Sequence, residues 1–492
     1  MFDRTSVTTI GVVTADRPIL VRRCLDSLVH HCDHHGRRPR FLVIDGSTKP
    51  SHQAATRSAV SQVAGDSGHH LEYVGLKEAN HLRSQLRVHD EVGSGLAPGS
   101  TGANRNLLLL LTAGEHVLTV DDDVVLETWS ATARDDGLAL MGHQQELFET
   151  TFFPDRVTAL NTVARSAVDV FSAHEALLGH SLSALVAQSS PAADLTRACG
   201  HLRSALEEGR PLVVKATFTG LAGDAGVYCP YRLLFSGGPL RQLLLTSAST
   251  FQTALTSREA SRIVHTNVVT HDRGCMAPCM GLANRDVVPP FMPTGRNEDG
   301  VFGVMLAASD PATVFGHVPV GVLHESNRPS ARPAEPILSA SASRLSDLMI
   351  SVVMRSRLPE ASTLDAWLRE MGHRFIDLAE LSSRDIAAYV SEMIIEERGL
   401  ELAQIDEAVD AENCPKHWRD GLTRYRDQLL ASMTTEAFYL PTEFHGVGTV
   451  EEGFDAFRAF MRGFGLLIDC WPDLWVAARA HNANAGDRSG PG

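Results

Sequence analysis

Three consecutive aspartates, at positions 121–123, are the residues of this sequence best suited to chemistry. They follow the apolar run at residues 117–120 and precede Val124 and Val125, which places them at the end of a predicted buried strand. Neighbouring carboxylates repel one another unless a positive charge neutralises them, and a divalent cation with oxygen ligands is the usual partner. The triplet therefore predicts a metal site, with a solvated acidic turn as the alternative.

Two more acidic residues follow predicted strands closer to the N-terminus. Residues 7–14 are rich in β-branched side chains and lead to Asp16, and residues 41–45 end at Asp45. In open α/β sheets, ligands bind beyond the carboxyl ends of the strands. We therefore expect Asp16, Asp45 and the triplet to face one crevice, although the Asp-Gly-Ser sequence at Asp45 is also common turn chemistry.

An acidic pair and a histidine occur later in the chain. Glu298 and Asp299 precede the apolar run at residues 301–306. A carboxylate in this position can cap a helix, and one with a raised pKa can act as a base. His324 follows a strand-like run at residues 320–323, where an imidazole is either a structural side chain or a ligand suited to Mn²⁺.

The elements that must position these residues alternate between strand and helix. After the first strand, Pro18 suits the first turn of a helix, and a further short strand is expected at residues 71–74. A leucine-rich helix opens near Ala103 and precedes the acidic strand. This alternation predicts an α/β fold with a mostly parallel sheet and helices on both faces.

The remainder of the chain is expected to be largely helical. Residues 135–210 have the pattern of a helical insertion without a clear strand, and a strand pattern returns at residues 212–218 and 263–270. The C-terminal region is helical and ends in a polar, glycine-rich tail that we expect to be disordered. The predicted divisions of the chain are residues 1–334, 335–480 and 481–492.

Composition argues against several classes of protein. The chain has 492 residues, 43% of them hydrophobic and 21% charged, which is ordinary for a soluble globular protein of two or three domains. No apolar run approaches the roughly 20 residues that span a bilayer, and no secretory signal pattern begins the sequence, so we expect a cytoplasmic protein without a membrane span. The net charge of −15 argues against a general affinity for nucleic acid. Eight cysteines without regular spacing do not indicate a disulfide framework.

Taken in order, four motifs resemble a GT-A type nucleotide-sugar glycosyltransferase, most similar to family 2. They are Thr14-Ala-Asp-Arg17 after the first strand, Val43-Ile-Asp-Gly-Ser47, Gly102-Ala-Asn-Arg-Asn106, and Val120-Asp-Asp-Asp123. Two later features extend the resemblance, Arg296-Asn-Glu-Asp-Gly300 and His324. Each motif alone is weak, but their order and spacing make the set fairly specific.

The resemblance implies a role for each of these residues. The ligands of a Mn²⁺ or Mg²⁺ ion that bridges the donor's diphosphate would be Asp123, His324 and Asp121. The nucleotide-sugar donor would be bound by Thr14, Asp16, Asp45, Arg105, Asp121 and Asp122. Asp45 would contact a uracil-type base, Asp121 would lie near the ribose, and Arg105 is alternatively part of a structural ion pair. Asp299 is the first choice for the base that deprotonates the acceptor, and Glu298 is the second.

The function implied by the resemblance is that of a metal-dependent, inverting glycosyltransferase. It would move a sugar from a nucleotide-sugar, a UDP-sugar by first choice, to a soluble acceptor such as a peptide, a protein or a small natural product. A nucleotidyltransferase is the alternative enzyme, although Thr14-Ala-Asp-Arg-Pro is a poor version of its glycine-rich loop. A non-catalytic binding or assembly protein with a degenerate GT-A fold is a third hypothesis. Under any of these hypotheses, the C-terminal helices could form a homo-oligomer interface.

Overall fold

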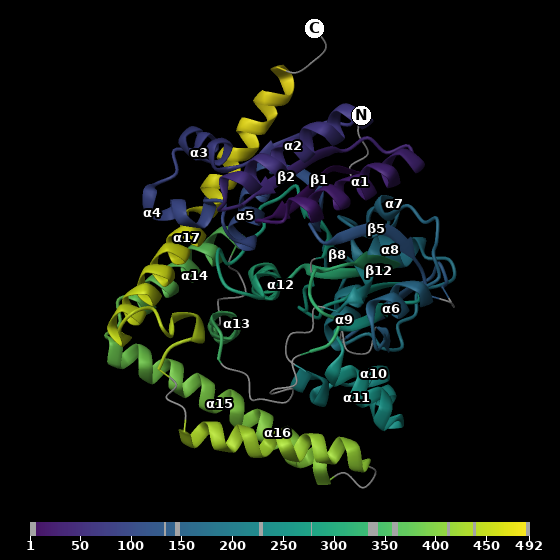
Figure 1. Ribbon diagram of the computed structural model, residues 1–492, viewed down its shortest axis with the longest axis vertical. Helices are drawn as coiled ribbons and strands as arrows, with labels where there is room; N and C mark the ends of the chain where they lie inside the picture. The colour runs from purple at the N-terminus through teal and green to yellow at the C-terminus, as the bar shows by residue number, and fades with distance from the viewer. Residues whose placement is uncertain are drawn as a thin grey trace.

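A large β-sheet forms the centre of the molecule, and helices surround it (Figure 1). The computed structural model describes residues 6–131, 134–142, 148–225, 230–276, 278–332, 343–356, 363–410, 414–435 and 439–488. The strands are β1 (Val7–Thr14), β2 (Arg40–Asp45), β3 (Leu71–Val74), β4 (Glu115–Asp121), β5 (Val124–Trp129), β6 (Leu138–Met141), β7 (Glu149–Phe152), β8 (Val213–Asp224), β9 (Glu259–Ile263), β10 (Asn267–Thr270), β11 (Cys279–Asn284) and β12 (Thr313–His324).

The sheet is mixed rather than mostly parallel. Its main path is β3-β2-β1-β4-β11-β8-β12-β10-β6, with β5 paired to β12 and β9 paired to both β7 and β8. Strands β3, β2, β1 and β4 are parallel, as the alternation of strand and helix predicts. Beyond β4 the prediction holds only for the parallel pairs β8–β12 and β6–β10. It is wrong elsewhere, because β11 runs antiparallel to β4 and β8, and β5 and β10 run antiparallel to β12. Parallel neighbours need a long crossover connection, and only two residues separate β4 from β5. Strand β5 therefore cannot lie parallel beside β4, and it pairs with β12 instead.

Element boundaries near the N-terminus agree with the sequence. Strand β1 covers the predicted residues 7–14, β3 covers 71–74, and β2 begins one residue before the predicted 41–45. The stretch at residues 263–270 is not one strand but the end of β9 and all of β10, separated by a bend. Its nearly continuous apolar pattern conceals that bend, because periodicity does not mark turns.

The predicted helical insertion at residues 135–210 also contains strands. Its helices are α6 (Arg156–Thr162), α7 (Val170–Glu175), α8 (Leu182–Gln188) and α9 (Gly200–Glu208). Strands β6 and β7 precede them, and they pair with β10 and β9 respectively. The expectation of a segment without strands is therefore wrong. These strands are four residues each and gain their partners from distant parts of the chain, so the local pattern does not reveal them.

Side chains that alternate along β2 show that helices cover both faces of the sheet, as predicted. Phe41 and Val43 pack in one apolar cluster with α1 and α2, whereas Leu42 and Ile44 pack in another with α5 and α12. The helices before β12, other than α6–α9, are α1 (Pro18–His34), α2 (Pro50–Ser67), α3 (Leu76–Gln85), α4 (Asp90–Gly93), α5 (Thr101–Leu111), α10 (Gly238–Thr246), α11 (Ala248–Thr256) and α12 (Glu298–Ser309), with 3₁₀ turns η1 (Ser94–Leu96) and η3 (Pro230–Phe235).

The C-terminal region is helical, as expected. It consists of α13 (Leu345–Arg355), α14 (Leu364–Ala379), α15 (Ser383–Asp410), α16 (Lys416–Thr435), the 3₁₀ turn η4 (Thr442–Phe444) and α17 (Val450–Arg488). Figure 1 shows α15 and α16 at the end of the molecule farthest from α1 and α2, while α17 runs along one side. No helix among the described residues is both long enough and apolar enough to cross a bilayer.

Helix α17 packs back against the sheet region. The indole of Trp471 donates a hydrogen bond to the carbonyl of Val288 at 2.6 Å, and that of Trp475 donates to the side chain of Asn284 at 2.9 Å. Residues of α5, α12, α14 and α17 share one apolar cluster. The helix also continues to Arg488, past the point where the sequence predicted a disordered tail, and residues 489–492 lie outside the described chain.

Close packing of α14 on α17 depends on two glycines. A Cβ added to Gly372 would lie 2.6 Å from the carbonyl oxygen of Gly465, which is closer than these atoms can approach. We expect Gly372→Ala to lower the free energy of unfolding by about 1–3 kcal/mol, because it overpacks this crossing. Gly399→Ala is the matched control: nothing lies near a Cβ at that position in α15, so it should raise stability by up to about 1 kcal/mol. Denaturant unfolding measures both, and a stabilising Gly372→Ala would contradict the packing argument.

Candidate active site

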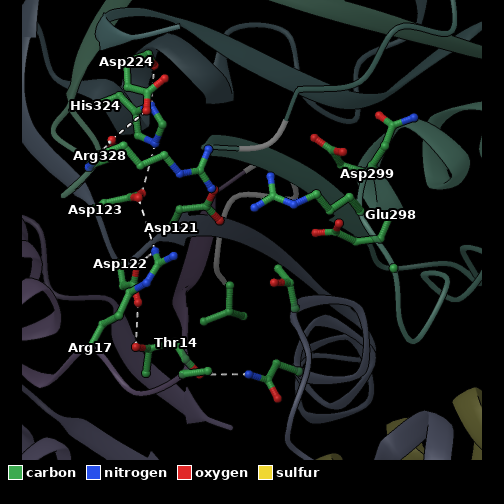
Figure 2. Close-up of a pocket in the computed structure, with 18 residues that line it drawn as sticks. Thr14, Arg17, Asp121, Asp122, Asp123, Asp224, Glu298, Asp299, His324 and Arg328 are labelled. Atoms are coloured by element: carbon green, nitrogen blue, oxygen red, sulfur yellow. Dashed lines mark hydrogen bonds and ion pairs between the residues drawn. The ribbon is translucent and has the colours of Figure 1, made fainter. Parts of the chain in front are cut away.

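A pocket of about 410 Å³ opens where four central strands end. Thr14, Asp121, Asp224 and His324 are the last residues of β1, β4, β8 and β12, and all four line it. Figure 2 shows these side chains facing Glu298 and Asp299 across the pocket. The predicted site residues in its lining are Thr14, Asp121, Asp122, Asp123, Glu298, Asp299 and His324.

The acidic triplet forms the corner between β4 and β5. Asp122 and Asp123 form the turn between the two strands. Strand β5, which follows the turn, pairs with β12 and not with β4. The carbonyl oxygen of Asp123 accepts a hydrogen bond from the backbone of Glu325 at 2.8 Å. This contact fixes the acidic corner against the end of β12, which brings Asp123 next to His324.

Asp122 is held by two residues of the β1 end. Its carboxylate accepts a hydrogen bond from the Thr14 hydroxyl at 2.6 Å and one from the Arg17 guanidinium at 3.1 Å. Burial and the neighbouring charge of Asp123 raise the pKa of Asp122 to about 7, against the opposing effects of Thr14 and Arg17. Asp122 thus links β1 to the acidic corner, and its predicted part in donor binding stays a prediction.

Asp123 and His324 form a close ion pair. The His324 Nε2 lies 3.0 Å from an oxygen of Asp123, and its Nδ1 lies 2.5 Å from the carbonyl oxygen of Asp224. Both ring nitrogens face acceptors, which favours the imidazolium form. Burial alone would lower the pKa of His324, but the hydrogen bond and charge of Asp123 raise it to about 9. Burial opposes ionisation of Asp123 as well, yet His324 and Arg17 hold its pKa at about 2.

Arg105 joins the acidic corner to the acidic pair of α12. This buried guanidinium lies 2.7 Å from Asp121 through one nitrogen and 2.7 Å from Glu298 through another. Burial would lower the pKa of Arg105, but these two carboxylates raise it. Burial raises the pKa of Glu298 to about 7 and also raises that of Asp121, with Arg105 opposing both shifts. Of the two roles predicted for Arg105, donor contact or structural ion pair, the ion pair is present in the structure, and the donor contact stays a prediction.

Asp299 lies at the start of α12 and lines the pocket beside Glu298. One of its oxygens accepts the backbone N–H of Gly300 at 2.9 Å, which satisfies one of the amides that the first turn of a helix leaves unpaired. The residue before the pair, Asn297, has a φ of 64°. A non-glycine residue in this left-handed region is uncommon, and here it turns the chain so that the acidic pair enters the helix facing the pocket.

Two predicted donor contacts, Asp16 and Asp45, lie outside the pocket lining. Asp16 accepts a hydrogen bond from the Thr48 hydroxyl at 2.9 Å and joins the loops after β1 and β2. Asp45 is buried, and its two oxygens accept from the backbone of Ser47 at 2.8 Å and from the Tyr73 hydroxyl at 2.9 Å. These contacts match the turn alternative for Asp45, and donor binding by either residue stays a prediction.

Several pocket residues were not singled out from the sequence. Arg17 had a signal, since it belongs to a motif that was recognised, and it neutralises both Asp122 and Asp123. Asp224 lies in a glycine-rich stretch, residues 220–226, that is typical of a turn, but residues 220–224 belong to β8, and Asp224 accepts a hydrogen bond from the Ser326 hydroxyl at 2.6 Å. Arg328 has no motif around it that could have indicated a role.

The residues of the pocket fit a cation only together with another ligand. Within the described chain, no group of three or more His, Cys, Asp or Glu side chains is arranged to hold a metal ion. Asp123 and His324 nevertheless touch, and Mg²⁺ commonly uses one or two protein ligands, completing its shell with phosphate oxygens and water. A ligating imidazole must be neutral, so a metal would displace the His324 proton. The donor set therefore suits an ion that enters with a phosphate group.

The Asp123–His324 ion pair should make the free energy of unfolding depend on pH. The pKa of His324 is raised from 6.5 to about 9, so the pair stabilises the folded chain fully below pH 6.5 and loses that effect as pH rises through 9. The shift corresponds to roughly 3 kcal/mol. In the presence of a chelator, unfolding free energies of the wild type should fall across this window, and those of His324→Asn should fall much less. His30→Asn, an exposed control, should follow the wild type; a His324→Asn profile as steep as the wild type's would contradict the ion pair.

The pocket combines an acidic corner, a buried arginine bridge and an acidic helix start. Its described lining contains more carboxylates than basic groups, which favours the binding of a cation. Arg17, Arg296 and Arg328 also line it and provide positive charge for an anionic ligand. Neither a scan against protein-family models nor a search of curated proteins found a match to this chain.

Proposed function

We propose that this chain is a metal-dependent glycosyltransferase of the GT-A type that moves a sugar from a nucleotide-sugar donor, a UDP-sugar by first choice, to a soluble acceptor. The observation that carries the proposal is the meeting of residues 121–123, His324, Glu298 and Asp299 around one pocket of about 410 Å³. These groups come from three distant parts of the sequence. A pocket of this size is within the range of small-molecule sites.

Donor binding is supported by the charges around the acidic corner. The guanidinium of Arg328 forms no ion pair within the described chain, and Figure 2 shows it extending toward Asp121. Together with Arg17 it offers donors for the diphosphate of a nucleotide-sugar. Asp123 and His324 would hold a Mn²⁺ or Mg²⁺ ion beside that diphosphate. Such an ion, when bound, stabilises the negative charge of the departing nucleoside diphosphate.

The acidic start of α12 supports the acceptor side of the reaction. An acceptor oxygen attacks the anomeric carbon, the bond from that carbon to the diphosphate oxygen breaks, and the acceptor's proton passes to a carboxylate. We assign this proton to Asp299, because Glu298 is held in its ion pair with Arg105. Arg105 then positions Glu298 relative to Asp121. A single displacement of this kind inverts the configuration of the sugar, and the acceptor would be a peptide, a protein or a small molecule.

Calorimetry with UDP and with GDP, each with and without Mn²⁺, tests the donor site. We expect UDP to bind in a Mn²⁺-dependent manner and Asp123→Asn to weaken this binding at least about tenfold, because a charge-assisted contact is lost. Asp66→Asn, an exposed change on α2, is the control that should bind like the wild type. If neither nucleotide binds with metal, or if Asp123→Asn binds as tightly as the wild type, the donor-site proposal fails.

The base is tested by transfer or hydrolysis of a nucleotide-sugar. Asp299→Asn should reduce the rate constant kcat by about 10²–10⁴, the usual contribution of a general base, while leaving UDP affinity near that of the wild type. Glu298→Gln should alter both, because it disturbs the ion pair with Arg105. Asp286→Asn, which is exposed and remote from the pocket lining, should retain activity. Full activity of Asp299→Asn would reject its assignment as the base.

A further inference from the structure

A second, much smaller pocket lies where β8 changes partners. On the edge of β8 that faces away from β12, residues 216–218 pair with β11 and residues 221–224 pair with β9. Thr219 and Gly220, between these two segments, pair with neither strand. The gap holds a pocket of about 20 Å³, lined by residues from β8, β9, β12 and the segment before β11. A single water needs roughly 10–15 Å³ by this kind of measure, so the pocket admits one small chemical group and no sugar or nucleotide.

Arg262 brings a positive charge into this pocket without a negative partner. Among the described residues, no carboxylate lies within ion-pair distance of its guanidinium. One nitrogen donates to the Met276 sulfur at 2.8 Å, which is a weak acceptor, and the guanidinium lies 4.4 Å from the centre of the Phe148 ring. Burial lowers the pKa of Arg262 to about 10, so it remains protonated at neutral pH. Other arginines near the pocket edge of the sheet, such as Arg105 and Arg156, do have carboxylate partners.

His317 is the second polar residue of this pocket and is also unsatisfied. It is 2% exposed, and neither ring nitrogen has a hydrogen-bond partner. The ring lies against Phe148 and Phe218, with centroids 5.1 and 5.3 Å away. Burial and the charge of Arg262 lower the pKa of His317 to about 3, so it is neutral and offers one N–H donor. Buried polar groups are normally paired, so the unpaired ring of His317 beside the unneutralised charge of Arg262 indicates a missing ligand.

The small pocket is adjacent to the candidate active site. Pro278, which lines the small pocket, accepts a hydrogen bond from the backbone N–H of Asp121 at 2.9 Å. Along β8, Leu221 of the small pocket is three residues from Asp224 of the large one, or roughly 10 Å in an extended strand. The two pockets are therefore neighbours at the same end of β8.

We propose that Arg262 and His317 bind a carboxylate group of the substrate whose reacting part lies in the large pocket. A carboxylate is small enough, carries the single negative charge that Arg262 lacks, and can accept from the guanidinium and from the His317 N–H together. The binding of a carboxylate stands on this pocket alone, but naming its bearer as the substrate rests on the proposed transferase function. The bearer is either the transferred sugar or the acceptor.

Thermal unfolding of the full chain, without nucleotide or metal, tests the carboxylate site. Sodium acetate should raise Tm by about 2 °C or more over acetamide at matched ionic strength. Arg262→Met should abolish this difference, while Arg424→Gln, which removes an exposed arginine without an ion pair in the described chain, should retain it. Without acetate, Arg262→Met should be at least as stable as the wild type, because a methionine replaces a partly buried charge that has no carboxylate partner among the described residues.

Two results would overturn the proposal: equal Tm values of the wild type in acetate and acetamide, or an acetate response of Arg262→Met equal to that of the wild type. Should Arg262→Met fail to fold, Arg262→Lys keeps the charge but not the planar fork, and it should respond to acetate less than the wild type does. A full response in Arg262→Lys would likewise reject recognition by the guanidinium.

The source of the carboxylate is identified with two nucleotide-sugars. If the carboxylate is on the donor sugar, the wild type should bind UDP-glucuronic acid more tightly than UDP-glucose in the presence of Mn²⁺, and Arg262→Met should lose that preference. If it is on the acceptor, Arg262→Met should lose the acetate response and bind both donors as the wild type does. Failure of both UDP and GDP to bind with Mn²⁺ would reject the transferase function and leave the acetate response intact, so the two proposals fail separately.

Discussion

Each carboxylate of the largely buried acidic corner is paired with at least one cation. Asp121 is paired with Arg105, Asp122 with Arg17, and Asp123 with His324. Burying an ionised carboxylate without a partner costs several kcal/mol, and three in sequence would also repel one another. The arrangement of the site depends on meeting this constraint, because removal of any one cation leaves a buried negative charge beside two others.

The three cations come from different elements, and this links the acidic corner to the topology of the sheet. Arg17 follows β1, Arg105 is in α5, and His324 ends β12. The first two are brought in by the parallel half of the sheet, where β1 lies beside β4. His324 is brought in because β5 crosses to pair with β12. The mixed half of the sheet is therefore necessary for the site, since a continuation of the parallel pattern would not place β12 at the acidic corner.

Sequence reasoning succeeded where the signal was local. Strand β1 and the apolar face of α1 follow directly from residue type and spacing, and the acidic triplet was placed correctly at a strand end. It failed where long-range pairing decides the structure, as for β6 and β7 and for the two strands within residues 263–270. The partners of Asp45 are a turn amide and Tyr73, a contact that depends on how β2 and β3 align. Arg262 and Arg328 carry no motif at all, so only the fold reveals them.

The two pockets differ in charge, and that difference bears on how a ligand would enter. The described lining of the large pocket contains six carboxylates with three arginines and His324, whereas that of the small pocket contains Arg262 and the neutral His317 but, among the described residues, no acid. Their separation along β8 is about one Debye length at physiological salt, so neither field is fully screened at the other pocket. A carboxylate is repelled by the acidic corner and attracted by Arg262. The same charges favour a cation in the large pocket, so the two pockets attract ligand groups of opposite charge.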